Sequence, residues 1–284
     1  MGLIQAAYGN AITFTSYQLF LISTFKGAGA LIAPFVSTQF AELPHWSFHY
    51  LISLGIAAVN ATFVALVFKG KTQDECLAEI GQETESDEKG EINEQSHLRQ
   101  IISIKAVHLL ALFLLVYVGL EVTIGGWIVS FMIAVRGGRP SAGYISAGFF
   151  GGLTLGRIVL LPLNKKIGER RIVYIYGLVA FALELVIWLV PSLVGGAVSV
   201  AIVGLVLGPI YPIGINHAGR VFPPRLVADV ISWTASIATT GAAVVPFATG
   251  AIAERAGIKS LEPVVVAMLA AILVLWALVP ADKI

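Results

Sequence analysis

The sequence predicts an all-α membrane protein with about eight transmembrane helices. Of its 284 residues, 57% are hydrophobic and only 12% are charged, and the mean hydropathy is +0.86. Soluble domains carry about 25% charged residues, so this chain has too few polar groups to cover a soluble surface. Eight apolar stretches each approach or exceed the roughly 20 residues that cross a bilayer core. By residue number they are 19–40, 46–68, 106–135, 141–163, 172–190, 195–216, 228–251 and 263–280.

The first two stretches follow a shorter apolar segment at residues 2–12, which we interpret as the stub of another helix. Lys26 interrupts the first stretch. Its long side chain reaches either the headgroups at the membrane surface or a polar cavity beside Asn60. The sequence leaves both alternatives open.

An acidic joint at 69–100 follows the second stretch and is the one clear change of composition. Its many carboxylates and few apolar residues favour a flexible or loosely helical linker. The only cysteine, Cys76, lies in it, so a disulfide within the chain is impossible. We expect a remnant bundle at 1–68, this linker, and a six-helix bundle at 101–284.

The basic residues predict how the helices are oriented. If the joint at 69–100 is cytoplasmic, twelve Lys and Arg residues fall on its side of the membrane and four on the other. Such a bias is typical of the cytoplasmic face. We therefore expect a multi-pass protein of the plasma membrane or an internal membrane such as that of the vacuole, with its C-terminus in the cytoplasm.

A short repeat connects the two parts of the chain. Residues 29–35 and residues 241–247 both fit the pattern GAxxxPF, and both lie in stretches expected to leave the cytoplasm. Two stretches with the same motif and direction are what parallel repeats of one bundle would give. If they are equivalent, the first part lacks most of a six-helix half.

Several segments resemble the major facilitator superfamily of secondary transporters, and within it fungal members related to the fucose/glucose–proton symporter group. The resemblance covers about residues 2–280 and places them as helices four to twelve of the family, with only a stub of helix four. The segments that carry it are Tyr117–Glu121 with Gly125-Gly126-Trp127, Gly156-Arg157, Lys166–Arg171 and Gly208–Pro212.

This resemblance implies transport of a small, sugar-like solute, coupled to protons, by alternating access in the full-length form. It also implies that helices one to three are missing, so we expect an N-terminally truncated chain. The alternative is a non-transporting fragment, or a membrane scaffold or sensor with a transporter fold. The expected partners are the lipid bilayer, a small solute and protons.

Glu121 is the leading candidate for a functional side chain. A charged carboxylate near the middle of a membrane helix costs at least about 2.5 kcal/mol, so it needs a proton, a partner or water. Tyr117 lies one turn earlier on the same face. Gly125 and Gly126 leave room nearby for water or solute. The alternatives are contact with the proton or solute, and a structural hydrogen bond.

Prolines interrupt the sixth stretch. Pro209 and Pro212 remove backbone donors and expose carbonyl groups, either to a binding site near the membrane midplane or to a neighbouring helix. Tyr211 and Asn216 are the polar side chains expected beside this break.

A charged turn follows the fourth stretch, and the resemblance favours a cytoplasmic latch of ion pairs that break during alternating access. Simple anchoring at the cytoplasmic surface is the alternative. The latch residues are Arg157, Lys166, Glu169, Arg170 and Arg171. Glu184 in the fifth stretch has no polar company on its helix face, so we expect a structural or lipid-interface role.

No residue pattern indicates an enzyme, a cofactor or a metal. His45 and His49 have the spacing of a shared metal site but lack a clear third ligand, and Trp46 beside them indicates interfacial anchoring. The five histidines are scattered, no GxxxxGK[ST] loop for nucleotide occurs, and the net charge of +1 gives no footprint for nucleic acid.

Overall fold

A computed structural model describes residues 29–71, 75 and 94–281, and every regular element in this part of the chain is a helix. Within these residues, six helices are long and apolar enough to cross a membrane, and a bent pair makes a seventh. Of the predicted stretch 19–40, the described part forms the helix Gly29–Phe40. The stub at 2–12 lies outside the described residues. The predicted all-α fold is confirmed.

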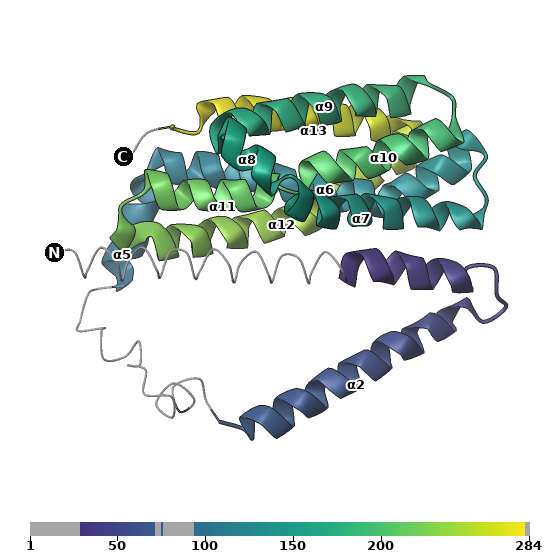
Figure 1. Cartoon of the computed structure of the whole chain (residues 1–284), viewed down its shortest axis with the longest axis horizontal. Helices are drawn as coiled ribbons and strands as arrows, with labels where there is room; N and C mark the ends of the chain where they lie inside the picture. The colour runs from purple at the N-terminus through teal and green to yellow at the C-terminus, as the bar shows by residue number, and fades with distance from the viewer. Residues whose placement is uncertain (1–28, 72–74, 76–93, 282–284) are drawn as a thin grey trace.

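The second stretch is the helix α2 (His49–Phe68), which follows the short turn η1 (Trp46–Phe48). The remaining helices form one bundle with its axes roughly along the long direction of Figure 1. They are α5 (Glu94–Ser103), α6 (Lys105–Arg136), α7 (Gly143–Val159), α8 (Leu161–Ile167), α9 (Glu169–Leu189), α10 (Leu193–Leu207), α11 (Ile210–Val221), α12 (Pro224–Ala256) and α13 (Leu261–Leu278).

The helix α6 lies at the centre of this bundle and contacts α7, α10, α11, α12 and α13. Buried residues follow one another along α6 from Ala106 to Met132, so most of this helix lies in the core of the bundle. Aromatic side chains fill the space between helices, as where Phe113 packs against Trp276 with ring centroids 4.8 Å apart. Tyr117 and Thr123 of α6 are therefore held inside the protein, and the Glu121 side chain is largely buried.

Glycines bring α7 and α10 into backbone contact. A Cβ atom at Gly152 would lie against the carbonyl oxygen of Ala201, and one at Gly156 against that of Leu205. Gly204 of α10 meets the carbonyl oxygen of Phe149 in the same way. Small residues at such positions let membrane helices approach closely. Gly152 and Gly156 of α7 thus lie directly against the backbone of α10.

Two of the predicted stretches are not straight helices. The fourth divides into α7 and α8, which are bent by 55°. The sixth divides into α10 and α11 at Gly208 and Pro209, where the prolines had predicted an interruption. The bend after α7 follows from Pro162 in the first turn of α8, because proline cannot continue the hydrogen bonding of the preceding turn.

The helices before the joint have very different environments. The helix Gly29–Phe40 packs on α7, where Gln39 hydrogen-bonds to the Tyr144 hydroxyl and the Phe35 ring lies tilted against the Tyr144 ring, with centroids 5.5 Å apart. In contrast, α2 has no buried residue and stands away from the bundle in Figure 1.

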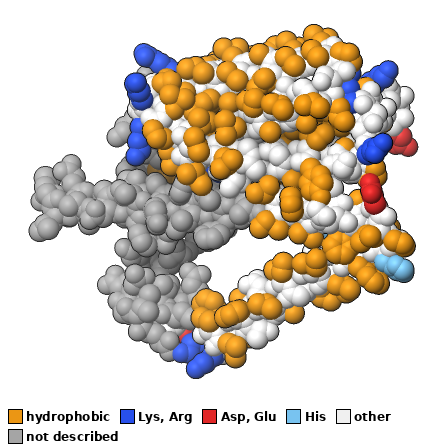
Figure 2. Space-filling view, turned by 45° about the vertical axis from the view of Figure 1, so that its right-hand side comes forward, with side chains coloured by type: hydrophobic (Ala, Val, Ile, Leu, Met, Phe, Trp, Pro, Cys, Tyr) orange, Lys and Arg blue, Asp and Glu red, His pale blue; other side chains and the backbone are white. Residues whose placement is uncertain are grey.

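The surface of the bundle is apolar in the middle and charged at its ends (Figure 2). Large apolar side chains such as Phe247 and Val194 are more than 70% exposed. So wide an apolar surface is unfavourable in water but stable in contact with lipid. Together with the long apolar helices, this surface identifies an integral, multi-pass membrane protein.

The α7–α10 contact gives a direct test of the packing. Gly152→Val places two methyl groups against the backbone of α10, so we expect a loss of stability on the order of 2 kcal/mol. The measurement is the melting temperature in detergent, followed by circular dichroism. Gly126→Val is the matched control, because nothing lies within 4 Å of a Cβ there. Equal melting temperatures for the two variants would contradict the described contact.

Candidate functional site

The break between α10 and α11 exposes two backbone carbonyl groups inside the bundle. In a continuous helix the oxygen of Gly208 would accept from the N–H of residue 212, but Pro212 has none. The Nε of Arg157 donates to this oxygen instead, at 3.3 Å. The hydroxyl of Tyr117 donates to the neighbouring carbonyl of Leu207 at 2.9 Å. Side chains from α7 and α6 thus complete the hydrogen bonding of the broken helix.

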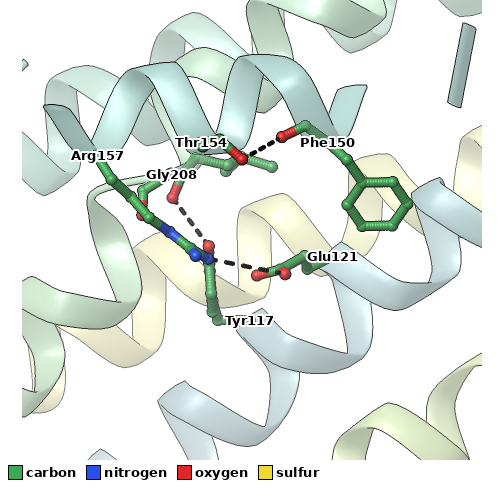
Figure 3. A network of polar contacts seen from close by, with 7 residues as sticks. Tyr117, Glu121, Phe150, Thr154, Arg157 and Gly208 are labelled. Atoms are coloured by element: carbon green, nitrogen blue, oxygen red, sulfur yellow. Dashed lines mark hydrogen bonds and ion pairs between the residues drawn. The ribbon is translucent and has the colours of Figure 1, made fainter. Parts of the chain in front are cut away.

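Arg157 also faces Glu121, with its Nη2 4.0 Å from the Oε1 of the acid. The arginine side chain is 6% exposed and the glutamate side chain 15% exposed. Figure 3 shows Arg157 reaching from α7 between Gly208 and Glu121, with Tyr117 below it. A charge buried this deeply needs an opposite charge and hydrogen bonds, and the Glu121–Arg157 pair supplies them.

Tyr211 completes the group. Its ring lies 6.4 Å from that of Tyr117, and the side chain is only partly buried. The candidate site therefore consists of Glu121 and Tyr117 from α6, Arg157 from α7 and Tyr211 from α11, beside the carbonyls of Leu207 and Gly208. Three of these side chains were predicted as neighbours of a membrane site from the sequence.

Arg157 was placed elsewhere by the sequence analysis. The sequence pattern places it in the charged cytoplasmic turn, but the structure puts it inside the bundle with Glu121. The signal that could have shown this is its position: Arg157 lies within an apolar run that continues from Ile158 to Leu161, so it needed a buried partner.

The space expected beside Glu121 is only partly present. A Cβ at Gly125 would meet the ring of Phe150, so this gap is filled by an aromatic side chain. Gly126 has nothing near it and is exposed. Thr154 on α7 is tied to its own helix through the carbonyl of Phe150, at 2.9 Å (Figure 3).

The other latch residues lie at the end of the bundle where α9 begins. Glu169 forms an ion pair with Arg220 of α11 at 3.2 Å, and Asn216 hydrogen-bonds to the same acid. Asn216 is thus part of this charged end and not a neighbour of Tyr211 in the site. Arg220 was missed because it stands in a different stretch of the sequence.

Arg170 joins the same end of the bundle to α13. Its guanidinium lies 5.1 Å from the centre of the Trp276 ring and donates to the carbonyl of Ala277. The indole of Trp276 donates in return to the carbonyl of Arg170 at 3.0 Å. Lys166 and Arg171 are exposed at this end.

The predicted cavity residue Asn60 is not brought to the site. Asn60 is exposed on α2, the helix without buried residues. Lys26 lies outside the described residues. Around η1, the Nδ1 of His49 is hydrogen-bonded to the carbonyl of Trp46 at 2.7 Å.

Comparison with known proteins gives both a sequence relative and solved structures of similar fold. A scan against models of protein families finds no match. The chain is 25% identical over 276 residues to Bypass of stop codon protein 6 of Saccharomyces cerevisiae, which covers 89% of this chain and 56% of the yeast protein.

Two solved structures of the fucose:proton symporter FucP share the fold. One is the crystal structure of the E. coli protein, with a TM-score of 0.57, and the other shows the transporter in an outward conformation, with a TM-score of 0.56. Each is 17% identical and covers 66% of this chain and 45% of the symporter chain. The chain spans about half the length of the proteins that it matches. Within the 66% of the chain that is covered, it has the fold of a major facilitator superfamily transporter.

Proposed function

We propose that this chain is part of a proton-coupled secondary transporter that carries a small hydroxylated solute by alternating access. The observation that supports this most is the Glu121–Arg157 pair beside the broken helix α10–α11. Broken helices mark the binding sites of secondary transporters, because their free carbonyls face a cavity or a neighbouring helix. Because the chain spans about half of its relatives, we propose the activity for a protein that carries the matching first half.

The chemistry of the pair fits proton coupling. Glu121 attracts Arg157 only while the acid is ionised. When Glu121 takes up a proton, Arg157 loses its counter-charge but keeps its bond to the Gly208 carbonyl. The contact between α6 and α7 then weakens, while that between α7 and the helix break remains. A proton at Glu121 is thereby linked to how these helices pack.

The solute class rests on Tyr211, the partly exposed polar side chain of the site. Its hydroxyl can donate a hydrogen bond to a sugar hydroxyl and accept one from it. The FucP structures carry fucose and proton in their name, so fucose is the first solute to test. A scaffold or sensor with this fold would show no solute movement in the same assay.

The ends of the bundle fit the same scheme. We assign the bundle from 101 to 284 to the second half of a transporter and the helices before residue 69 to the end of the first half. The Glu169–Arg220 pair and Asn216 are our candidates for the cytoplasmic latch, with Arg170 holding α9 to α13.

Glu121→Gln tests the proton coupling. The amide keeps the size of the side chain and its hydrogen bonding but cannot titrate. We expect the variant to lose accumulation of fucose driven by a pH gradient and to retain exchange of fucose across vesicles without a gradient. The measurement is radiolabelled uptake in proteoliposomes that contain the protein with a complete first half.

Glu254→Gln is the matched control, since Glu254 is exposed at the end of α12. It should accumulate the solute as the unchanged protein does. Uphill uptake that survives in Glu121→Gln would reduce this acid to a structural role.

The ion pair itself can be measured by a double-mutant cycle. Arg157→Gln leaves the Glu121 carboxylate without its counter-charge, and Glu121→Gln leaves the Arg157 guanidinium without its counter-charge. Each single variant should therefore destabilise the fold. The double variant should lose less than the two single losses together, with a coupling free energy of roughly 1–3 kcal/mol. Thermal unfolding in detergent gives the values, and strict additivity would exclude a direct pair.

The orientation is tested by labelling cysteines in a Cys76→Ser background. We expect Lys259→Cys to react with a membrane-impermeant maleimide added to intact cells, and Lys166→Cys to react only after the membrane is opened. Both lysines are exposed, at opposite ends of the bundle. The reverse pattern would overturn the cytoplasmic assignment of the joint at 69–100.

A further inference from the structure

A second group of buried charges lies where α6, α9 and α13 meet, at the far end of the bundle from α5. Glu184 of α9 is 1% exposed and Glu262 of α13 is 0% exposed. Their carboxyl groups interact with each other, and the charge of Arg136 acts on Glu262. The polar neighbour of Glu184 thus stands on another helix and not on its own helix face, and its burial does not agree with the lipid-interface role considered for it.

This group is separate from the candidate transport site. Glu121 and Arg136 both belong to α6 and are fifteen residues apart. At about 1.5 Å of rise per residue, the two sites are roughly 22 Å apart along that helix.

Arg136 is fixed in place by backbone carbonyls. Its Nη2 donates to the carbonyls of Ile187 at 2.7 Å and Trp188 at 2.9 Å. These carbonyls belong to the last turn of α9, where a helix has no N–H groups left to satisfy them. The guanidinium is thus held at the end of α9, beside the helix that carries Glu184.

The two acids lack a donor. Among the described residues, the Oε2 of Glu184 and both carboxyl oxygens of Glu262 have no hydrogen-bond partner. Ionised carboxylates only accept hydrogen bonds, whereas a protonated carboxyl also donates one. Two ionised acids in contact would repel each other in a medium that screens charge weakly. One proton between them removes the repulsion and supplies the missing donor.

We propose that Glu184 is a protonated carboxylic acid that donates its hydrogen to an ionised Glu262, forming a buried proton-binding site between α9 and α13. The charges then balance, since the single carboxylate is matched by Arg136. Glu262 is the member that keeps the charge because it stands in the first turn of α13, where the helix dipole stabilises an anion. A bound metal cation would instead add positive charge beside Arg136.

Infrared spectroscopy tests this assignment, because a protonated carboxyl has a C=O stretch well separated from that of a carboxylate. The chain with Glu121→Gln, at neutral pH, is the starting protein, so that the transport site contributes no carboxyl signal. Adding Glu184→Gln should remove one protonated-carboxyl band and leave the melting temperature nearly unchanged, because the amide still donates to Glu262. Adding Glu262→Gln should shift this band without removing it.

Glu254→Gln, an exposed acid, is the control and should leave the band as it is. The proposal is overturned if the starting protein shows no protonated-carboxyl band, a result that does not require any further variant to fold. It is also overturned if Glu184→Gln leaves the band intact, or if sodium removes the band at constant pH, which would assign the site to a cation.

Discussion

Polar groups inside a membrane bundle have no water to hydrogen-bond with, so each needs a partner within the protein. This requirement governs the centre of the molecule. Pro212 frees the carbonyl of Gly208, Arg157 enters the bundle to satisfy it, and the charge of Arg157 in turn needs Glu121. The hydroxyl of Tyr117 donates to the carbonyl of Leu207 beside it. The missing N–H of Pro212 thereby accounts for the positions of Arg157 and Glu121, which come from two other helices.

The close approach of α7 and α10 is what allows this arrangement. A Cβ at Gly208 would lie against the carbonyl oxygen of Leu153, so only glycine lets the helix break lie directly on α7. Arg157 stands one turn after Leu153 and reaches the break from there. The same glycine therefore serves the packing of two helices and the polar site, and the site cannot be separated from the contact that carries it.

Much of the fold could be predicted from the sequence, because apolar length decides where a membrane helix lies. The helix interruption at Pro209 and the pairing of Tyr117 with Glu121 on one face also followed from local rules. What could not be predicted were contacts between distant stretches. Composition says nothing about which helices touch, so the partners of Arg157, Glu169 and Glu184 became visible only once α6, α7, α9, α11 and α13 were packed together.

The contrast between α2 and α12 has a consequence for how the protein enters its membrane. The segment Trp46–Phe68 has a mean hydropathy of 2.2, and none of its most apolar part is buried. The segment Arg225–Ala256 has a mean hydropathy of only 1.4. Transfer into lipid is decided by hydrophobicity before helices associate. The segment that forms α2 can thus partition from the translocon on its own. The segment that forms α12, with hydroxyl groups along much of its length, gains more from the presence of α6, its most extensive neighbour, so its integration is coupled to the assembly of helices synthesised earlier.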